Sequence, residues 1–172
     1  MPIVRDFWSY RFATPRIVRC GKFVGRGWYW KLYVVENILR IFIHSALSAQ
    51  ISPQWWDIAV DPEIRKNADR FKRQYAKKKA QHTLPGHHDI YYVFLSDLNK
   101  IILANSNLLL PVVPDIDQWI AKIEEIRTPR NLVGHMNFPD ERDRRRIDQT
   151  HSRVASLISQ LQARGLPVEI PQ

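Results

Sequence analysis

Arg130, Asn131 and His135 place a guanidinium, a side-chain amide and an imidazole within six residues, at the end of an amphipathic helical pattern. An imidazole can accept or donate a proton near neutral pH. A guanidinium offers forked donors that match two oxygens of a phosphate. The three groups are therefore of the kinds that acid–base catalysis on a phosphate uses.

The spacing of these residues limits how they can meet. Five residues of helix turn His135 by about 140° from Arg130, so the two side chains cannot pair within one regular helix. They converge only if the helix breaks near Gly134, or if a second chain completes the site. The spacing alone decides nothing, because Arg145 and Arg146 stand in the same relation to His151. Context favours Arg130, which follows an apolar helical stripe, whereas the other pair lies in a highly charged helix.

The composition is that of one globular domain of 172 residues, with 45% hydrophobic and 25% charged residues. A net charge of +9 favours a polyanionic partner, nucleic acid first, because binding phosphates releases counterions. Cys20 is the only cysteine, which excludes an intrachain disulfide and a zinc-finger framework.

Neither a secretory signal nor a membrane span is expected. The apolar run from Trp28 to Leu47 is interrupted by five polar or charged residues, and the cytoplasm is the default location. His82, His87 and His88 share a loop, but no carboxylate or cysteine stands at a familiar ligand spacing. The sequence thus predicts no metal site and no cofactor.

Hydrophobic periodicity predicts an all-α fold, an antiparallel bundle of about five helices with a loop-rich basic arm in front. The expected helices cover residues 28–50, 61–82, 90–104, 115 onward and 139–164. Three segments follow from this pattern, namely an arm (1–27), a helical domain (28–165) and a tail (166–172). Pro129 lacks an amide hydrogen, so we expect a kink or stop there, or a new turn capped by Thr128.

The arm at residues 1–27 mixes arginines with aromatic residues, and its prolines and glycines predict loops with short extended pieces. It could contact RNA, with arginines on phosphates and aromatic rings on bases. The alternative, which we favour, is that the arm packs on its own domain or on a partner subunit.

Two of the expected helices carry polar faces. On 28–50, Glu36, Arg40 and His44 follow one another at helical spacing. They form either an ion pair beside a surface histidine, or the lining of a polar cleft. The helix over 61–82 has a basic face that could attract an RNA backbone or simply be solvated. Its candidate RNA-binding residues are Arg65, Lys66, Arg70, Arg73, Lys77 and Lys78.

The segment from Arg130 to His135 resembles the R-N-x-x-x-H form of the R-x4-6-H signature of the HEPN superfamily. Three further features are similar to the Swt-type branch, and the resemblance spans roughly residues 28–160. These features are the Glu36-Asn37…Arg40 segment, the Trp55-Trp56 pair, and Ser96-Asp97-Leu98 in a leucine-rich helix.

The resemblance implies a helical bundle that forms a homodimer with the two signature segments facing each other. It also implies metal-independent endoribonuclease activity, as found in many toxins and in defence or RNA-surveillance effectors. Some members pair with an antitoxin that modifies a tyrosine two positions after the signature histidine. That position is Asn137 here, so this form of the motif is absent.

The residues suit RNA cleavage by attack of the 2′-hydroxyl on the adjacent phosphorus. His135 would transfer protons, Arg130 would stabilise the phosphorane, and Asn131 would orient the phosphate or the histidine. A two-fold dimer would supply two histidines, one as acid and one as base.

Two alternatives to this catalytic interpretation remain. One is a non-catalytic HEPN-like module that binds RNA or a protein. The other is a helical structural subunit, in which Arg130 is a charge at a helix C-terminus and His135 is a capping or core residue.

Overall fold

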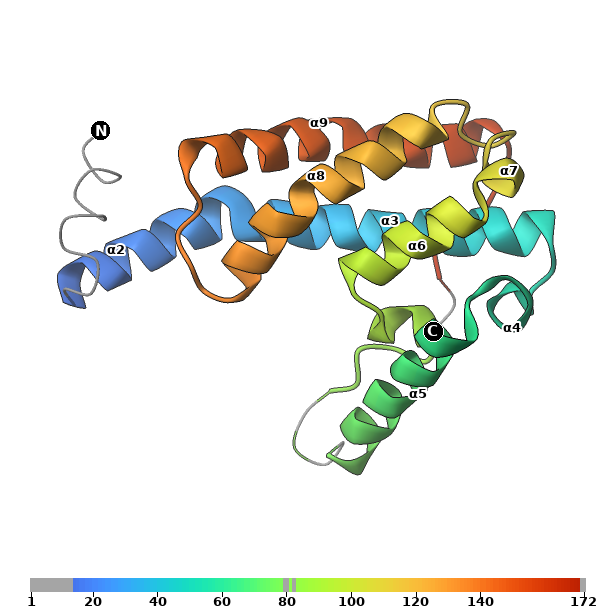
Figure 1. Ribbon diagram of the computed structural model, residues 1–172, viewed down its shortest axis with the longest axis horizontal. Coiled ribbons are helices and arrows are strands. Elements are labelled where there is room, and N and C mark those ends of the chain that lie inside the picture. Colours follow the sequence, from blue (N-terminus) through green and yellow to red (C-terminus); the bar gives the residue numbers. More distant parts are fainter. Residues whose placement is uncertain (1–13, 79–80, 82, 171–172) are drawn as a thin grey trace.

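The computed structural model describes residues 14–78, 81 and 83–170, and these residues form helices and no strands (Figure 1). The all-α fold class is confirmed. In chain order the elements are α2 (Thr14–Val24), η1 (Gly25–Tyr29), α3 (Trp30–Gln50), α4 (Trp55–Ala59), α5 (Pro62–Lys77), η2 (Asp89–Tyr92), α6 (Leu95–Ala104), α7 (Ser106–Leu109), α8 (Ile116–Gly134) and α9 (Glu141–Ala163).

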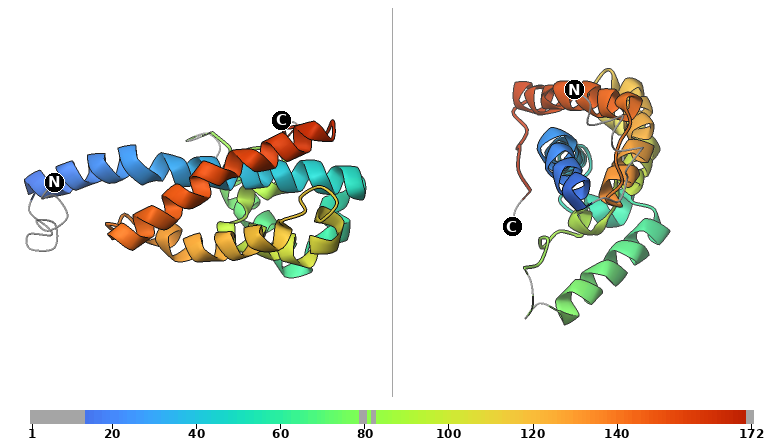
Figure 2. Two further views of the ribbon diagram at one scale, coloured as in Figure 1. Left: turned by 90° about the horizontal axis from the view of Figure 1, so that it is seen from above. Right: turned by 90° about the vertical axis from the view of Figure 1, so that its left-hand side faces the viewer.

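The core forms around α3. Its buried side chains recur at helical spacings and include Val35, Leu39, Phe42, Ile43 and Ala46. Seen end-on, α9 lies along one side of α3 and α8 along a second side (Figure 2), while α6 packs against both α3 and α8. The expected helices at 28–50, 61–82, 90–104, 115 onward and 139–164 correspond to α3, α5, α6, α8 and α9.

Residues 14–27 correct the expected loop-rich arm, because they are helical and continue directly into α3. The expected boundary between arm and domain at residue 27 therefore falls inside one long helical run. Tertiary contacts explain why the glycines do not break it: the ring of Phe23 packs edge-on against Trp28 at 4.9 Å and stacks on Phe138 at 5.9 Å. The guanidinium of Arg144 lies over both Phe23 and Trp28. Residues 1–13, where the rest of the arm was expected, lie outside the described residues.

A π-helical turn, η1, joins α2 to α3. Such turns insert one extra residue into a helix and occur frequently beside functional sites. Tyr29, the last residue of η1, faces the hollow described below. Apart from Gly25 and Gly27, nothing in the sequence indicates this turn.

The helix expected over 90–104 is interrupted. Asp89–Tyr92 form a short 3₁₀ turn, Val93 and Phe94 are extended, and α6 begins at Leu95. The cap of the 3₁₀ turn is His88, since His88 Nδ1 accepts from the Ile90 amide at 3.1 Å. This break brings the carbonyl groups of Ile90 and Val93 toward Arg40 on α3.

Pro129 does not break α8, which runs without interruption to Gly134. Pro129 is buried on the same stripe as Ile126 and Val133. Packing of this stripe against the core outweighs the hydrogen bond that proline cannot donate. The expectation of a stop or a new turn at this position is therefore wrong.

The helix Ile17–Gln50 is long and apolar enough to cross a membrane, judged by length and composition. Half of its most apolar window is buried inside the structure, as in the core helix of a soluble protein, which passes the same test. The helix is thus weak evidence for a membrane span.

Candidate active site

A hollow of about 860 Å³ opens beside α3. α3 supplies Glu36 and Arg40, and the end of α8 supplies Arg130 and His135. Further lining comes from α5 and from the segment that precedes α6. The structure therefore brings together, within one chain, four of the residues that the sequence analysis selected.

Glu36 is the centre of this group, because its carboxylate accepts from two guanidinium groups. Oε1 lies 2.7 Å from Nη2 of Arg40, and Oε2 lies 3.1 Å from Nε of Arg130. The Glu36 side chain is only 13% exposed. One negative charge thus holds two positive charges, which leaves the cluster with a net charge of +1 before His135 is counted.

Arg40 is buried, and each nitrogen of its guanidinium donates a hydrogen bond within the protein. Its Nε donates to the carbonyl of Ile90 at 3.2 Å, and its Nη2 donates to the carbonyl of Val93 at 3.1 Å as well as to Glu36. Its Nη1 donates to the side chain of Asn37 at 3.2 Å. Arg40 therefore anchors the segment before α6 to α3, and four of the five N–H groups of its guanidinium donate within the protein.

Arg130 is more accessible, with 26% of its side chain exposed. Nε donates to Glu36, Nη1 donates to the side-chain oxygen of Asn131 at 3.3 Å, and the guanidinium lies 6.0 Å from the ring centroid of Phe94. Nη2 has no protein partner among the described residues. The guanidinium is thus held in place with one edge able to meet an anion.

The end of α8 resolves the geometric problem posed by the spacing. The helix ends at Gly134, and His135 is its C-cap. The Met136 amide donates to the carbonyl of Val133, and the Asn137 amide donates to that of Leu132. This is a Schellman motif, which turns the chain sharply and lets His135 reach the hollow that Arg130 lines.

Met136 occupies the left-handed position of this motif, with φ of +60°. That position usually holds glycine, because a side chain there costs about 1–2 kcal/mol. Met136 is 83% exposed, so burial does not offset this cost. Strained residues cluster at functional sites. The sequence offered no signal for this strain, since Gly134 stands two positions too early.

His135 and Asn131 are both exposed. The His135 imidazole has no hydrogen-bond partner in the part of the chain that the structure describes, and its main chain is fixed by the Asn131 carbonyl and the Asn137 amide group. Asn131 binds Arg130 but is not among the residues that line the hollow. Its position therefore suits orientation of the arginine.

His44 is a correction to the expected cleft lining, because it lies away from the hollow. Its Nδ1 accepts from the indole N–H of Trp55 at 3.3 Å, and its ring meets that of His88 at 4.8 Å. His88 in turn stacks on Trp55 at 5.5 Å. One helical turn beyond Arg40, α3 has passed the hollow and entered the core beside α4.

Burial lowers the pKa of His44. Burial also lowers the pKa of His88, to about 4, with help from the charges of His44 and Lys72 and against the opposing charge of Asp89. The hydrogen bonds agree with neutral rings, since Nδ1 accepts a hydrogen bond in both histidines and so cannot carry a proton. His44 and His88 lie 44 residues apart in the sequence, and their role is to support the fold.

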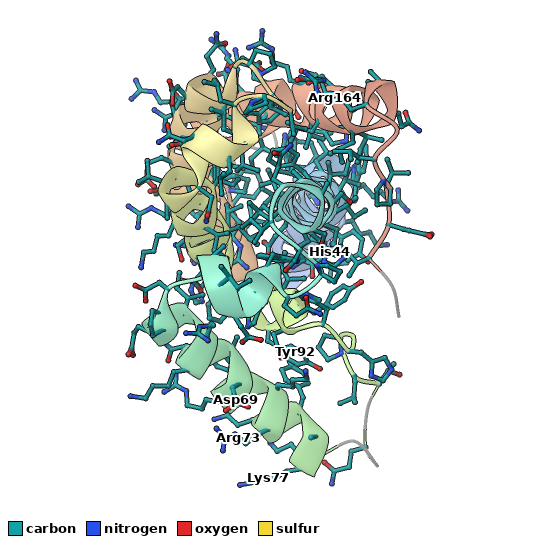
Figure 3. All side chains as sticks on the ribbon, turned by 90° about the vertical axis from the view of Figure 1, so that its right-hand side faces the viewer. His44, Asp69, Arg73, Lys77, Tyr92 and Arg164 are labelled. Carbon is teal, nitrogen blue, oxygen red and sulfur yellow. The ribbon has the colours of Figure 1, made fainter. Side chains whose placement is uncertain are left out.

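The basic face of α5 divides into paired and unpaired charges. Arg65 pairs with Asp57 at 3.3 Å, Arg73 pairs with Asp69, and Arg70 lies over the ring of Phe71. Figure 3 shows Asp69 and Arg73 side by side and Lys77 at the outer end of the helix. Lys66, Lys77 and Lys78 are exposed and have no ion-pair partner among the described residues.

A second hollow, of about 490 Å³, adjoins the first and is mainly apolar. α2 supplies Ile17 and Val24 to it, and Val133 and Met136 line both hollows. Ile17 and Val18 on α2 are about half exposed. No group of three histidine, cysteine or carboxylate side chains in the described residues lies close enough together to hold a metal ion.

Comparison of the chain with protein-family models, with curated proteins and with solved structures found no match.

Proposed function

We propose that this protein is a metal-independent endoribonuclease of HEPN type, acting as a homodimer on RNA. The single observation that carries the proposal is that Arg130 and His135 line one open hollow together with Glu36. The pair at Arg145/Arg146 and His151 contributes nothing to that hollow's lining, and the His151 ring packs against Trp30 at 4.7 Å instead.

The proposed reaction needs one proton acceptor, one proton donor and a cation. The RNA 2′-hydroxyl gives its proton to an imidazole and attacks the adjacent phosphorus, which yields a 2′,3′-cyclic phosphate. The bond to the 5′-oxygen breaks, and that oxygen takes a proton from an acid. Arg130 would stabilise the negative charge that develops on the phosphorane through its unpaired Nη2.

One chain offers one exposed histidine at this hollow, whereas the reaction uses an acid and a base. A second copy would bring a second His135 to the site. The second, mainly apolar hollow lies beside the first and supports this assembly, because exposed apolar surface of this kind marks sites where proteins associate. Measurement of the mass in solution tests it: a monomer that cleaves RNA at full rate would contradict the dimer.

The experiment for the activity is incubation of RNA with excess EDTA. We expect cleavage with 2′,3′-cyclic phosphate ends, and a fall of about 100-fold or more in the His135→Ala variant. His151→Ala is the matched control, because it stands at the same spacing from an arginine but lies outside the hollow. Cleavage that requires added metal, or that survives His135→Ala, contradicts the proposal.

A non-catalytic RNA- or protein-binding module is the second candidate, and one observation favours it. Arg130 is already bound by Glu36 and Asn131, as a structural ion pair would be. RNA binding by the wild-type protein without any cleavage would select this alternative.

An enzyme that acts on cellular RNA would work in the cytoplasm, which is the location we propose.

A further inference from the structure

Four tyrosines line the hollow together with Arg130 and His135, and we call them the tyrosine wall. Tyr29 is the last residue of η1 and Tyr33 lies in the first turn of α3, while Tyr75 comes from α5 and Tyr91 from η2. Tyr29, Tyr33 and Tyr75 are 52%, 66% and 42% exposed. Exposed tyrosines that converge on one hollow need an explanation, because each leaves apolar ring surface in water.

Tyr29 and Tyr33 continue the polar stripe of α3 in the N-terminal direction. Tyr29, Tyr33, Glu36 and Arg40 follow at spacings of four, three and four residues, so they share one side of the helix. Both side chains line the hollow, so their rings are available to a ligand on the same side as Glu36 and Arg40.

Within the described part of the chain, no aromatic ring or cation packs against Tyr29 or Tyr33, whereas Tyr75 meets Tyr92 at 5.9 Å. The next turn of α3 carries Glu36, which holds Arg130. Arg130, a cation that suits a phosphate, thus lines the same hollow as two exposed rings that suit a base.

We propose that the tyrosine wall is a nucleobase-binding subsite, so that the hollow takes unpaired RNA with a base against Tyr29 and Tyr33 and its phosphate at Arg130. This inference rests on the proposed function and names its substrate class. Unpaired RNA is required, because bases inside a duplex are stacked and paired and cannot turn their faces to a protein ring.

The subsite discriminates little between bases. Ring stacking accepts every base, because every base has a π-face. Asn37 is a side-chain amide that lines the hollow, but Nδ2 donates to the Tyr33 carbonyl at 2.8 Å and Oδ1 accepts from Arg40. Its groups are thus occupied in fixing the helix rather than in reading a base edge. We expect a strong preference for single strands and a weak preference for sequence.

The far side of the wall is fixed by close packing. Tyr92 Oη donates to the Gly86 carbonyl at 2.8 Å, and Gly86 lies directly against the ring of Tyr91. A side chain at position 86 would meet that ring and displace it. The glycine therefore lets Tyr91 stand where it lines the hollow.

The test uses the full-length His135→Ala protein, so that RNA is bound and not cut. Three probes of equal length are compared: a single-stranded RNA oligonucleotide containing 2-aminopurine, the same strand with abasic positions, and an RNA duplex. We expect the first to bind about tenfold more tightly than the other two, with quenching of 2-aminopurine fluorescence on binding.

Substitutions at Tyr33 assign the effect. Tyr33→Leu should weaken binding of the single strand about tenfold and remove most of the quenching, while Tyr33→Phe keeps both. Trp30→Leu is the matched control, because it removes an exposed aromatic ring from the same helix outside the hollow. If Tyr33→Leu does not fold, Tyr29→Leu carries the test.

The outcomes separate this inference from the activity it rests on. Equal binding of intact and abasic strands, or quenching that survives both leucine variants, overturns the base subsite. The endoribonuclease still stands in that case if the wild-type protein cleaves RNA and His135→Ala does not. Quenched, tyrosine-dependent binding without cleavage by the wild-type protein supports the subsite and overturns the enzyme. No binding to any probe overturns both.

Discussion

Glu36 Oε2 on α3 lies 3.1 Å from Nε of Arg130 on α8, and this contact joins two helices across 94 residues of sequence. The other carboxylate oxygen binds Arg40, which binds the carbonyls of Ile90 and Val93. A single buried carboxylate thus fixes both the candidate phosphate-binding arginine and the segment that forms the far wall of the hollow.

The substitution Glu36→Gln should lower the free energy of unfolding by about 1–3 kcal/mol, since it leaves two guanidinium groups without their shared anion. Arg40 retains carbonyl partners, which keeps the loss below that of a fully unpaired buried charge. Unfolding in urea measures the effect. Glu141→Gln is the control: its pair with Arg145 has side chains 78% and 69% exposed, so its loss should stay below about 0.5 kcal/mol. Equal losses in the two variants would contradict the buried role of Glu36.

Met136→Gly should raise the free energy of unfolding by about 0.5–1 kcal/mol. Glycine adopts a φ of +60° without steric cost, and this gain exceeds its larger loss of backbone entropy. Thermal unfolding measures the change. Gly165, at the same position after α9 with φ of +65°, provides the reverse experiment, because Gly165→Ala should destabilise by about 1 kcal/mol. A destabilised Met136→Gly protein would show that the methionine side chain makes a contribution that exceeds its backbone strain.

The pair of partly buried imidazoles, His44 and His88, predicts a loss of stability in acid. Burial and the neighbouring charge of His44 lower the pKa of His88 from 6.5 to about 4, and burial lowers that of His44. The unfolded chain therefore binds protons at a higher pH than the folded one. Stability is complete above pH 6.5 and falls as the pH is lowered toward 4. After allowance for partial exposure, we expect a loss of about 1–2 kcal/mol from His88.

Urea unfolding between pH 7.5 and pH 4 measures this loss, and His88→Asn tests its origin. Asparagine keeps a side-chain acceptor for the Ile90 amide but does not titrate, so the stability of this variant should depend less on pH. His87→Gln alters an exposed histidine next to it and should leave the pH dependence unchanged. An unaltered acid transition in His88→Asn would place its cause elsewhere.

The sequence predicted what depends on neighbours along the chain. Helical spacing located α3, α5, α6, α8 and α9. Glu36 and Arg40 could be grouped because they lie one turn apart. These signals use interactions within a few residues, which a single sequence displays.

What the sequence could not supply depends on distant partners. Residues 14–27 are helical because of rings and charges from residues 138 and 144. His44 lies away from the hollow because it bonds to Trp55 and its ring packs against His88. The sequence does not indicate the tyrosine wall for the same reason, since its members come from η1, α3, α5 and η2 and meet only in the fold.

The unpaired lysines of α5 should set the salt dependence of RNA binding. Each phosphate contact on a single strand contributes about 0.7 to the slope of log K against log salt. Lys77→Gln with Lys78→Gln should therefore weaken binding in low salt and lower that slope by about 1.4. Binding of a single-stranded oligonucleotide to the His135→Ala protein across a salt series measures both. Arg65→Gln with Arg73→Gln makes the same change in net charge on the same helix, but these arginines already pair with Asp57 and Asp69. We expect a smaller change of slope from that control, and equal slopes in the two double variants would show that net charge alone, and not the position of the unpaired lysines, governs binding.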